Sequence, residues 1–444
     1  MFKVLVIGQP FNKVSGGGIT ISNLFSLLPN DLIFLATNTH RALKNDPEIC
    51  KNVYLLGPKE TKIPIIFRPF IRNFISGKIF YTVDVNSSIL EINPSIISKK
   101  YSRIYRFLSW IVSKLDLNFL FFKIKPSKEF LRWVTEIKPD IIYTQLGHLE
   151  FIEFTRLLKL KIDTPLVVHI MDDWIENSAT GIFRNFWQSK IKLSFLNLSN
   201  QIDLLMCISD EMSAEYQKKY KKEVISFHNP VDFNLFSNQC KPFSFNQEID
   251  KFLICYTGRV GFSNENSILR MSDAIEILNK MGYNISFRIF TRDYLLIRKI
   301  IKSQFTEVLE PVNHEKIAQV FAQSHLLFLP LDFDSDSLKF TRLSFPSKAS
   351  EYMVSKRPIL LNAHKSLAIT KHAIKFNWAT IVDNDRLQCL VDSVEMIFNN
   401  YSSTEHLVEN AYLFAEKNFN INTVASRFSK TLEQVIFKKN YVQQ

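Results

Sequence analysis

The feature that most constrains this chain is a series of short runs in which successive residues are apolar. Because side chains alternate between the two faces of a strand, such runs predict strands buried on both faces. Longer segments with helical periodicity separate them, so we expect parallel sheets covered by helices on both sides, an α/β fold. The predicted strands are 3–8, 32–37, 140–145, 165–171, 203–209, 252–258, 285–291, 326–331, 357–362 and 379–383.

The runs form two groups, separated by a polar segment with two prolines at about 230–250. That composition is typical of a linker, and a chain of 444 residues is too long for one hydrophobic core. We therefore predict two doubly wound, Rossmann-like domains at 1–235 and 250–425, followed by a C-terminal helix at 426–444.

Glycine is scarce, with 11 in the chain, and two glycine-rich stretches each follow the first strand of a predicted domain. Gly16, Gly17 and Gly18 precede a helical pattern, and Gly258 and Gly261 follow the strand at 252–258. Ligands of open α/β sheets bind beyond the carboxyl ends of the strands, where glycines let the backbone approach them. Tight turns alone would explain one such loop; two predict a ligand-lined cleft between the domains. Neither is G-x-G-x-x-G, so the dinucleotide fingerprint is absent.

The stretch "FPSKASEYMVSKRPILLN" (345–362) combines a helix start with three polar groups. Ser347 and the first-turn N–H groups can donate to a phosphate, and Lys348 adds a positive charge. Glu351 lies one turn further on the same face, where a carboxylate can accept both hydroxyls of a ribose. The pattern fits a nucleoside diphosphate, but a capping box or a surface ion pair fits it equally well.

The formal charge of +12 is concentrated between residues 59 and 128, which hold 13 Lys or Arg against four Asp or Glu. The same window has 12 aromatic residues, and residues 101–112 place an apolar stripe on one helical face. This composition fits an anionic membrane surface, and a core-facing helix with a basic edge fits as well. Nucleic acid is not favoured, because no nucleic-acid-binding motif accompanies the charge.

Nothing in the sequence predicts secretion or a membrane span. No apolar stretch approaches the ~20 residues that a spanning helix needs, and the N-terminus predicts a strand rather than a signal peptide. The five cysteines are scattered without a Cys-x-x-Cys pair, which argues against zinc or a disulfide framework and fits a reducing compartment. We expect a cytoplasmic protein, associated peripherally with the inner face of the cell membrane.

Four segments resemble the GT-B glycosyltransferases, in particular the family 4 type of bacterial polysaccharide biosynthesis. "FPSKASEYMVSKRPILL" resembles the signature Pro-Ser-Lys-x-x-Glu-Tyr-Met-x-x-Gly-x-Pro-Ile-Leu of that family. "CYTGRVGFSNENS" resembles its Gly-Arg turn, "VVHIMDDW" its active-site histidine strand, and "CISDEMSAEYQKKYKKEVISFHNPVDFNLF" the segment before its hinge. The matches span both domains in order and imply a GT-B fold and glycosyl transfer.

The resemblance implies roles for individual residues. Arg259 matches the diphosphate-binding arginine, and Lys348 the second cation. Glu351 matches the ribose-binding glutamate, with Ser347 and Gly258 beside the nucleotide. His169 matches the histidine that contacts the donor sugar, so His169, Arg259 and Lys348 are the expected catalytic residues. Gly16, Gly17 and Gly18 match the glycine loop beside donor and acceptor.

The sequence also departs from the family pattern. Leu343 stands where the Glu-x7-Glu motif has its first glutamate, and Lys356 replaces the signature glycine. The lysine usually found after the Gly-Arg turn is missing from "VGFSNENS", and the glycine of Pro-Asn-Gly-Val-Asp is missing from "NPVD". Sugar specificity must therefore come from other residues, and the loss of one of two diphosphate cations would weaken donor binding unless Lys348 compensates for it.

Carboxylates elsewhere are less distinctive. Asp172 and Asp173 follow His169 and either orient an acceptor or cap the next helix. The run "DFDSDS" (332–337) lacks the spacing of an EF-hand, so we expect a polar loop and no metal site. His148 and His228 are expected to be structural.

These observations predict a glycosyltransferase that moves a sugar from a nucleotide diphosphate sugar to a glycan or lipid-linked acceptor. Retention of anomeric configuration and independence of metals and cofactors are implied by the resemblance. Two other functions remain open: a nucleotide-sugar epimerase of the same fold, and a non-catalytic relative that binds nucleotide or lipid.

Overall fold

The computed structural model describes residues 1–62, 75–79, 123–177, 183–241, 245 and 251–442. The chain divides into two compact units, Met1–Phe227 with Ala425–Gln444, and His228–Val424. The change of unit therefore falls at Phe227, before the polar segment at 230–250. The C-terminal segment belongs to the first unit, and it lies on a helix that begins at Ile421 rather than near 426.

The first unit is built on an eight-stranded sheet with the order β10-β9-β8-β7-β1-β2-β3-β5. All neighbouring strands are parallel except β3 and β5. A separate antiparallel pair joins β4 (Thr61–Lys62) to β6 (Lys123–Ile124). The strands of the large sheet are β1 (Val4–Ile7), β2 (Ile33–Thr37), β3 (Asn52–Leu55), β5 (Gly77–Ile79), β7 (Ile141–Thr144), β8 (Leu166–Ile170), β9 (Leu204–Cys207) and β10 (Val224–Ser226).

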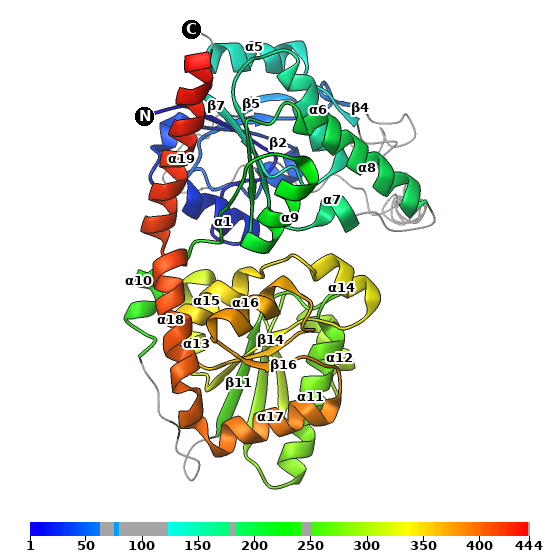
Figure 1. Cartoon of the computed structure of the whole chain (residues 1–444), viewed down its shortest axis with the longest axis vertical. Coiled ribbons are helices and arrows are strands. Elements are labelled where there is room, and N and C mark those ends of the chain that lie inside the picture. Colours follow the sequence, from blue (N-terminus) through cyan, green and yellow to red (C-terminus); the bar gives the residue numbers. More distant parts are fainter. Residues whose placement is uncertain (63–74, 80–122, 178–182, 242–244, 246–250, 443–444) are drawn as a thin grey trace. The chain divides into compact units, whose positions relative to one another are not determined.

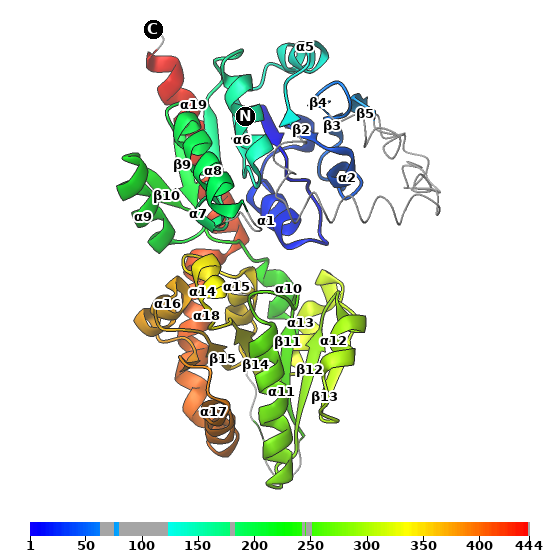
Figure 2. The same cartoon turned by 90° about the vertical axis from the view of Figure 1, so that its right-hand side faces the viewer.

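This sheet is doubly wound. From β1 the chain steps to β2 and β3 on one side, and later from β7 to β8, β9 and β10 on the other. Right-handed crossovers in opposite directions put their helices on opposite faces, and the strand order reverses between β1 and β7. The helices of this unit are α1 (Gly16–Leu24), α2 (Thr39–Ala42), α5 (Lys128–Ile137), α6 (Leu149–Lys159), α7 (Trp174–Asn177), α8 (Arg184–Ser199), α9 (Asp210–Tyr220) and most of α19 (Ile421–Val442) (Figures 1 and 2).

The second unit has a six-stranded parallel sheet with the order β13-β12-β11-β14-β15-β16, which reverses between β11 and β14. Its strands are β11 (Phe252–Thr257), β12 (Ile285–Phe290), β13 (Thr306–Leu309), β14 (Leu326–Pro330), β15 (Ile359–Asn362) and β16 (Thr380–Val382). Its helices are α10 (Phe233–Ser237), α11 (Glu265–Lys280), α12 (Tyr294–Ile300), α13 (Ile317–Ala322), α14 (Ser335–Thr341), α15 (Ser347–Val354), α16 (Ala368–Phe376), α17 (Leu387–Asn399) and α18 (Glu405–Phe419).

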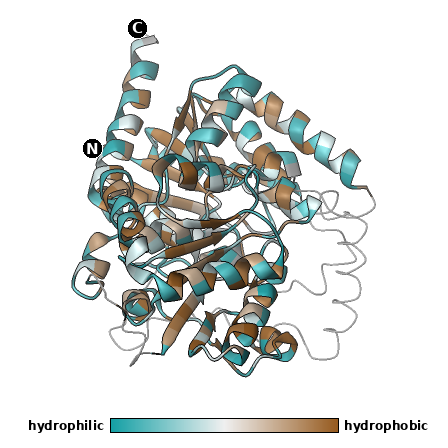
Figure 3. Cartoon of the chain, turned by 60° about the horizontal axis from the view of Figure 1, so that its bottom comes forward, coloured by the Kyte–Doolittle hydropathy of each residue, from teal (hydrophilic) through white to brown (hydrophobic). Residues whose placement is uncertain are grey.

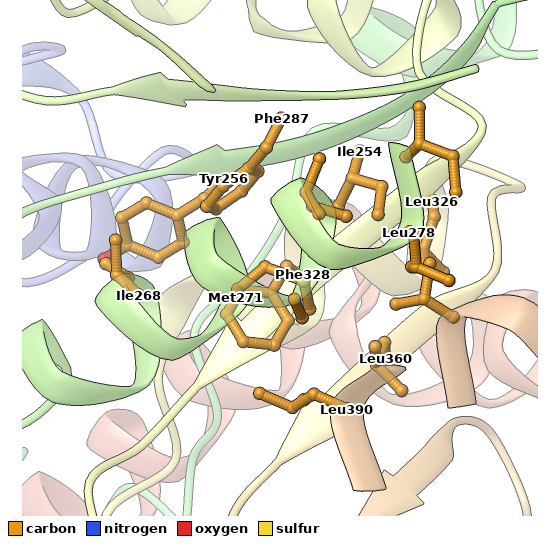
Figure 4. Close-up of a cluster of buried hydrophobic side chains, with 14 of the residues drawn as sticks. Ile254, Tyr256, Ile268, Met271, Leu278, Phe287, Leu326, Phe328, Leu360 and Leu390 are labelled. Atoms are coloured by element: carbon orange, nitrogen blue, oxygen red, sulfur yellow. The ribbon is translucent and has the colours of Figure 1, made fainter. Parts of the chain in front are cut away.

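The cores explain why the strands are apolar at every position. All six residues of β11 are buried, and one face of that strand contributes Ile254 and Tyr256 to a cluster with residues of α11 and α17 (Figure 4). In Figure 3 the strands are mainly brown, while the helices carry hydrophilic colour as well. A central strand between two helix layers has no face in contact with solvent. Its sequence therefore does not alternate between apolar and polar residues.

All ten predicted strands are present, within two residues at each end. The α/β prediction with two doubly wound sheets is therefore confirmed. Among the described residues, the strands that the sequence did not predict are the internal strand β3, the edge strands β5, β10 and β13, and the short pair β4 and β6.

Candidate functional site

The loop after β11 presents Arg259 at the point where the second sheet reverses its strand order. Gly258 adopts φ +151°, and a Cβ on it would lie 2.8 Å from the hydroxyl of Tyr256. That hydroxyl donates to the Arg259 carbonyl at 2.6 Å, and the Asn264 amide donates to the same carbonyl at 3.0 Å. The backbone is thus fixed while the Arg259 side chain is exposed.

Helix α15 brings the predicted lysine and glutamate together. Lys348 Nζ lies 2.9 Å from Glu351 Oε2, and His314 Nε2 lies 3.5 Å from Glu351 Oε1. Glu351 is 7% exposed. Burial alone would raise the pKa of this carboxyl, but the charge of Lys348 and the contact with His314 outweigh it and lower the pKa to about 2. Glu351 is therefore a carboxylate at neutral pH, held between two donors.

A hydrogen bond ties α15 to the end of β11. The hydroxyl of Tyr352 accepts from the backbone N–H of Thr257 at 3.1 Å, and both residues are buried. Tyr352 follows Glu351 directly, and Thr257 precedes Gly258 and Arg259. This bond places the Lys348–Glu351 pair at the same edge of the sheet as the loop that carries Arg259.

The structure also answers whether Ser347 forms a capping box. Pro346 is the N-cap of α15, and no side chain caps this helix. Ser347 is the first helical residue, and its carbonyl accepts from the Ser350 hydroxyl. The Lys348–Glu351 ion pair does form, but with a carboxylate that is buried rather than on the surface. The N-terminus of α15 thus keeps first-turn N–H groups that no side chain satisfies.

The neighbouring helix α11 is capped differently. Asp332, which follows β14 and is 1% exposed, accepts from Ser267 N at 2.7 Å and from Asn266 N at 3.1 Å. Asp334 caps α14 by accepting from Ser337 N at 3.0 Å. Within the described residues no group of three or more His, Cys, Asp or Glu is arranged to hold a metal. The first two carboxylates of "DFDSDS" are therefore helix caps.

The glycine triplet of the first unit is the first turn of α1, not a loop before it. Ser15 caps this helix, its hydroxyl accepting from Gly18 N at 3.2 Å. A Cβ on Gly18 would lie 2.3 Å from the side chain of Asn12, and one on Gly17 would lie 2.7 Å from Gln9. Gly16 is exposed at the helix start. Close packing against Asn12 is thus one reason for glycine here.

His169 lies inside the first unit. Its ring is 0% exposed, and Nδ1 lies 2.8 Å from the hydroxyl of Tyr143 on the neighbouring strand. Asp173 is equally buried and accepts from the Tyr216 hydroxyl at 2.9 Å, whereas Asp172 is exposed. Of the two predicted acceptor residues, only Asp172 reaches solvent. His169, Asp172 and Asp173 follow one another at the carboxyl end of β8.

Most of the basic, aromatic window lies outside the described residues, including the predicted amphipathic face at 101–112. In the part that is described, Lys59 pairs with Glu129 at 2.6 Å, and Glu60 is buried and accepts from Gly57 N. Among the helices that the structure describes, none is long and apolar enough to cross a membrane.

Solved structures of low sequence identity share this fold. HepE from Anabaena, in complex with UDP and glucose, is 13% identical with a TM-score of 0.61, and 98% of this chain and 100% of that chain are covered. Sucrose-phosphate synthase from Thermosynechococcus elongatus is 11% identical with a TM-score of 0.62 over 99% of this chain and 100% of that one.

A trehalose-6-phosphate synthase from Burkholderia multivorans is 12% identical with a TM-score of 0.59, covering 100% of this chain and 99% of its own. No family model and no curated protein match the sequence. Likeness at this identity shows the fold, so the chain has the GT-B fold that the sequence predicts.

Proposed function

We propose that this GT-B chain is a glycosyltransferase that uses a nucleoside diphosphate sugar as donor. The observation that carries the proposal is the ion pair of Lys348 with the buried carboxylate of Glu351, on a helix whose N-terminus no side chain caps. Similarity of fold supports the proposal, since the structurally similar HepE was solved with UDP and with UDP-glucose. No resident cofactor is needed, because the nucleotide sugar is the co-substrate.

The second unit would hold the donor. The diphosphate binds the first-turn N–H groups of α15 at Ser347, with Lys348 and Arg259 as cations. The carboxylate of Glu351 accepts from the two ribose hydroxyls, which its low pKa favours because the ionised form only accepts. Gly258 keeps the loop after β11 compact enough for this approach.

The reaction breaks the bond between the anomeric carbon and the diphosphate oxygen and forms one to the acceptor hydroxyl oxygen. Negative charge builds up on the departing diphosphate, where Arg259 and Lys348 stabilise it. These cations supply the charge that a metal supplies elsewhere, so we propose metal-independent transfer, with retention as the resemblance implies. The acceptor proton leaves with the diphosphate or to solvent.

In the first unit we propose supporting roles. The ring of His169 is wholly buried, so we assign it to fixing the carboxyl end of β8. Gly16, Gly17 and Gly18 fix the start of α1, and we assign the exposed Asp172 to contact with the acceptor.

We further propose a cytoplasmic location on the inner face of the membrane, with a glycan or lipid-linked acceptor of polysaccharide biosynthesis. The charge of residues 59–128 supports it, through attraction to anionic lipid. Cosedimentation with vesicles of phosphatidylglycerol and phosphatidylcholine tests this. The double charge-reversal variant Arg103→Glu and Arg106→Glu is expected to lower the fraction of protein bound to the vesicles. Unchanged binding would refute the proposed association with the membrane through residues 59–128.

Arginine and glutamate substitutions test the donor site. In Arg259→Ala and Glu351→Ala we expect UDP to bind at least tenfold more weakly by isothermal titration, and sugar transfer to fall further. Arg288→Ala is a matched control, since Arg288 forms an exposed pair with Glu307 in the same unit. If both site variants keep wild-type turnover, the site is assigned wrongly.

One observation favours a second candidate, a protein that binds nucleotide without transferring sugar. Leu343 is 5% exposed and apolar at the position where the resemblance expects a carboxylate. UDP binding with no product from any donor, by product analysis, would support this candidate over transfer. Conversion of the donor sugar without an acceptor would instead identify an epimerase.

A further inference from the structure

Helix α8 of the first unit is apolar on its inner face, as the layered fold requires. Trp187, Ile191 and Phe195 are buried, and the helix packs against α6 and α7 (Figure 1). The opposite face is left to water, and on a surface helix that face normally carries polar residues. The outer face of α8 departs from this rule.

A row of large apolar side chains runs along the outer face of α8. Phe186, Leu193 and Leu196 are each between 50% and 61% exposed. Leu193 follows Phe186 by about two turns and precedes Leu196 by three residues, so the three lie on one side of the helix. Phe183, the N-cap, is half exposed and extends the row. Each of the other helices that the structure describes exposes at most two large apolar side chains, so this row is the strongest candidate for a binding surface.

The charged residues of α8 are all positive. By helical spacing Lys190 and Lys192 flank the row on its two sides, and Arg184 is exposed at the start of the helix. Lys192 pairs with Glu176 of α7 at 2.8 Å. The segment 177–202, which contains the whole helix, holds no Asp or Glu. The outer face of α8 is therefore both apolar and cationic.

A row of apolar side chains between cations fits an anionic lipid surface. A helix that lies in the plane of such a surface buries Phe and Leu at the boundary of headgroups and acyl chains, and its Lys and Arg reach lipid phosphates. Lys190 Nζ lies 6.0 Å from the ring centroid of Phe186, so a cation stands at the edge of the apolar row, as in side chains that extend to a headgroup. A second copy of the chain would bring the same cations face to face, which disfavours self-association through this face.

We propose that the outer face of α8, formed by Phe183, Phe186, Lys190, Leu193 and Leu196, docks on an anionic phospholipid surface with the helix axis parallel to it. Because the inner face of α8 is packed on α6 and α7, this contact would attach the first unit as it is folded. The inference rests on the membrane location proposed above and names a docking element for it. It depends neither on residues 59–128 nor on binding of the sugar donor.

Cosedimentation of the full chain with phosphatidylglycerol vesicles tests this surface. In the α8 double variant, Phe186→Gln with Leu193→Gln, we expect a partition coefficient at least tenfold lower than in wild type. Leu413→Gln is the matched control and should change nothing, since Leu413 is similarly exposed on α18 of the second unit. Lys190→Gln should lower binding to these vesicles several-fold and leave binding to pure phosphatidylcholine vesicles unchanged.

A fluorescent label reports the contact directly and does not depend on loss of binding. Cys389 is the one native cysteine that is not buried, so it is replaced by serine. A bimane group is then attached to Leu193→Cys or, as a control, to Leu413→Cys. With phosphatidylglycerol vesicles we expect a blue shift of the emission for the label on α8 and none for the label on α18.

The outcomes separate this inference from the proposals above. If Arg103→Glu with Arg106→Glu lowers vesicle binding, whereas the α8 double variant and the label on α8 show no effect, this inference is overturned and the membrane location stands. If only the α8 double variant lowers binding, the inference stands and the role of residues 59–128 falls. Absence of wild-type binding overturns both, and the donor site is tested separately by the UDP titration.

A protein partner on the same face would give a different result. Light scattering would show a mass that rises with concentration in wild type and not in the α8 double variant, while vesicle binding stays equal in the two. That result would assign the face to a second copy of the chain and overturn the lipid proposal.

Discussion

Replacing Glu351 by glutamine should remove a pH-dependent part of the stability of the second unit. Burial opposes ionisation of this carboxyl, but Lys348 and His314 lower its pKa from 4.5 to about 2. At about 1.4 kcal/mol per pKa unit, the ionised form contributes at most about 3.5 kcal/mol to the free energy of unfolding. Glutamine keeps the shape and one acceptor but cannot ionise.

The sign follows from the lowered pKa. The contribution is fully present above pH 4.5, the value in the unfolded chain, and is lost as pH falls towards 2. The assay is urea unfolding of wild type and Glu351→Gln between pH 3 and pH 8. The difference between the two free energies of unfolding should be constant above about pH 5 and shrink steadily below it. The contributions of all other titratable groups cancel in this difference.

An exposed carboxylate provides the control. Glu307 pairs with Arg288 on the surface of the same sheet, and such pairs contribute roughly 0–1 kcal/mol. Glu307→Gln should show almost no pH-dependent difference. If the difference for Glu351→Gln does not change between pH 3 and pH 7, the carboxyl is not held ionised and the reasoning about its two donors is wrong.

Three further substitutions test contacts that position helices beside the two sheets. Tyr352→Phe leaves the buried N–H of Thr257 without its acceptor and should cost about 1–3 kcal/mol of unfolding free energy, with weaker UDP binding by calorimetry. Asp332→Ala uncaps α11 and should cost about 2 kcal/mol, measured by urea unfolding; an unchanged midpoint would contradict the cap. Gly18→Ala forces a Cβ against Asn12 and should cost about 1–3 kcal/mol, visible as a lower thermal midpoint, whereas Gly16→Ala at the exposed helix start should not.

The sequence predicts the central strands well because burial on both faces leaves a local signal. It misses two short edge strands for the same reason: β10 (Val224–Ser226) and β5 (Gly77–Ile79) contain partly exposed residues and have one neighbour each. The internal strand β3 is also missed, although three of its four residues are buried. The return of the chain to the first unit could not be predicted either. Phe428 packs on Phe25, 5.0 Å between ring centroids, and no local pattern encodes a contact across the whole chain.

Prediction of the candidate site from the sequence has the same limit, because contacts between distant segments leave no local pattern. Lys348 and Glu351 are three residues apart on one helix, so their pairing follows from helical geometry. His314 approaches Glu351 from a short 3-10 helix (His314–Lys316) earlier in the chain, and Asp332 caps α11 from the end of another strand. Only the strand order brings these residues together, and nothing in their own segments indicates a partner.

Lys356 shows how a departure from a family pattern can leave the backbone unchanged. The resemblance expects glycine at this position, and Lys356 adopts φ +54°, the left-handed conformation that glycine favours. A side chain in that region costs about 1 kcal/mol or more. Its ammonium lies 4.5 Å from the ring centroid of Tyr412 on α18. A cation–π contact of this kind stabilises the folded state by roughly 0.5–1 kcal/mol, which offsets part of that cost. The turn between α15 and β15 therefore adopts a left-handed conformation at Lys356 without a glycine, shortly after the helix that carries Glu351 and Tyr352.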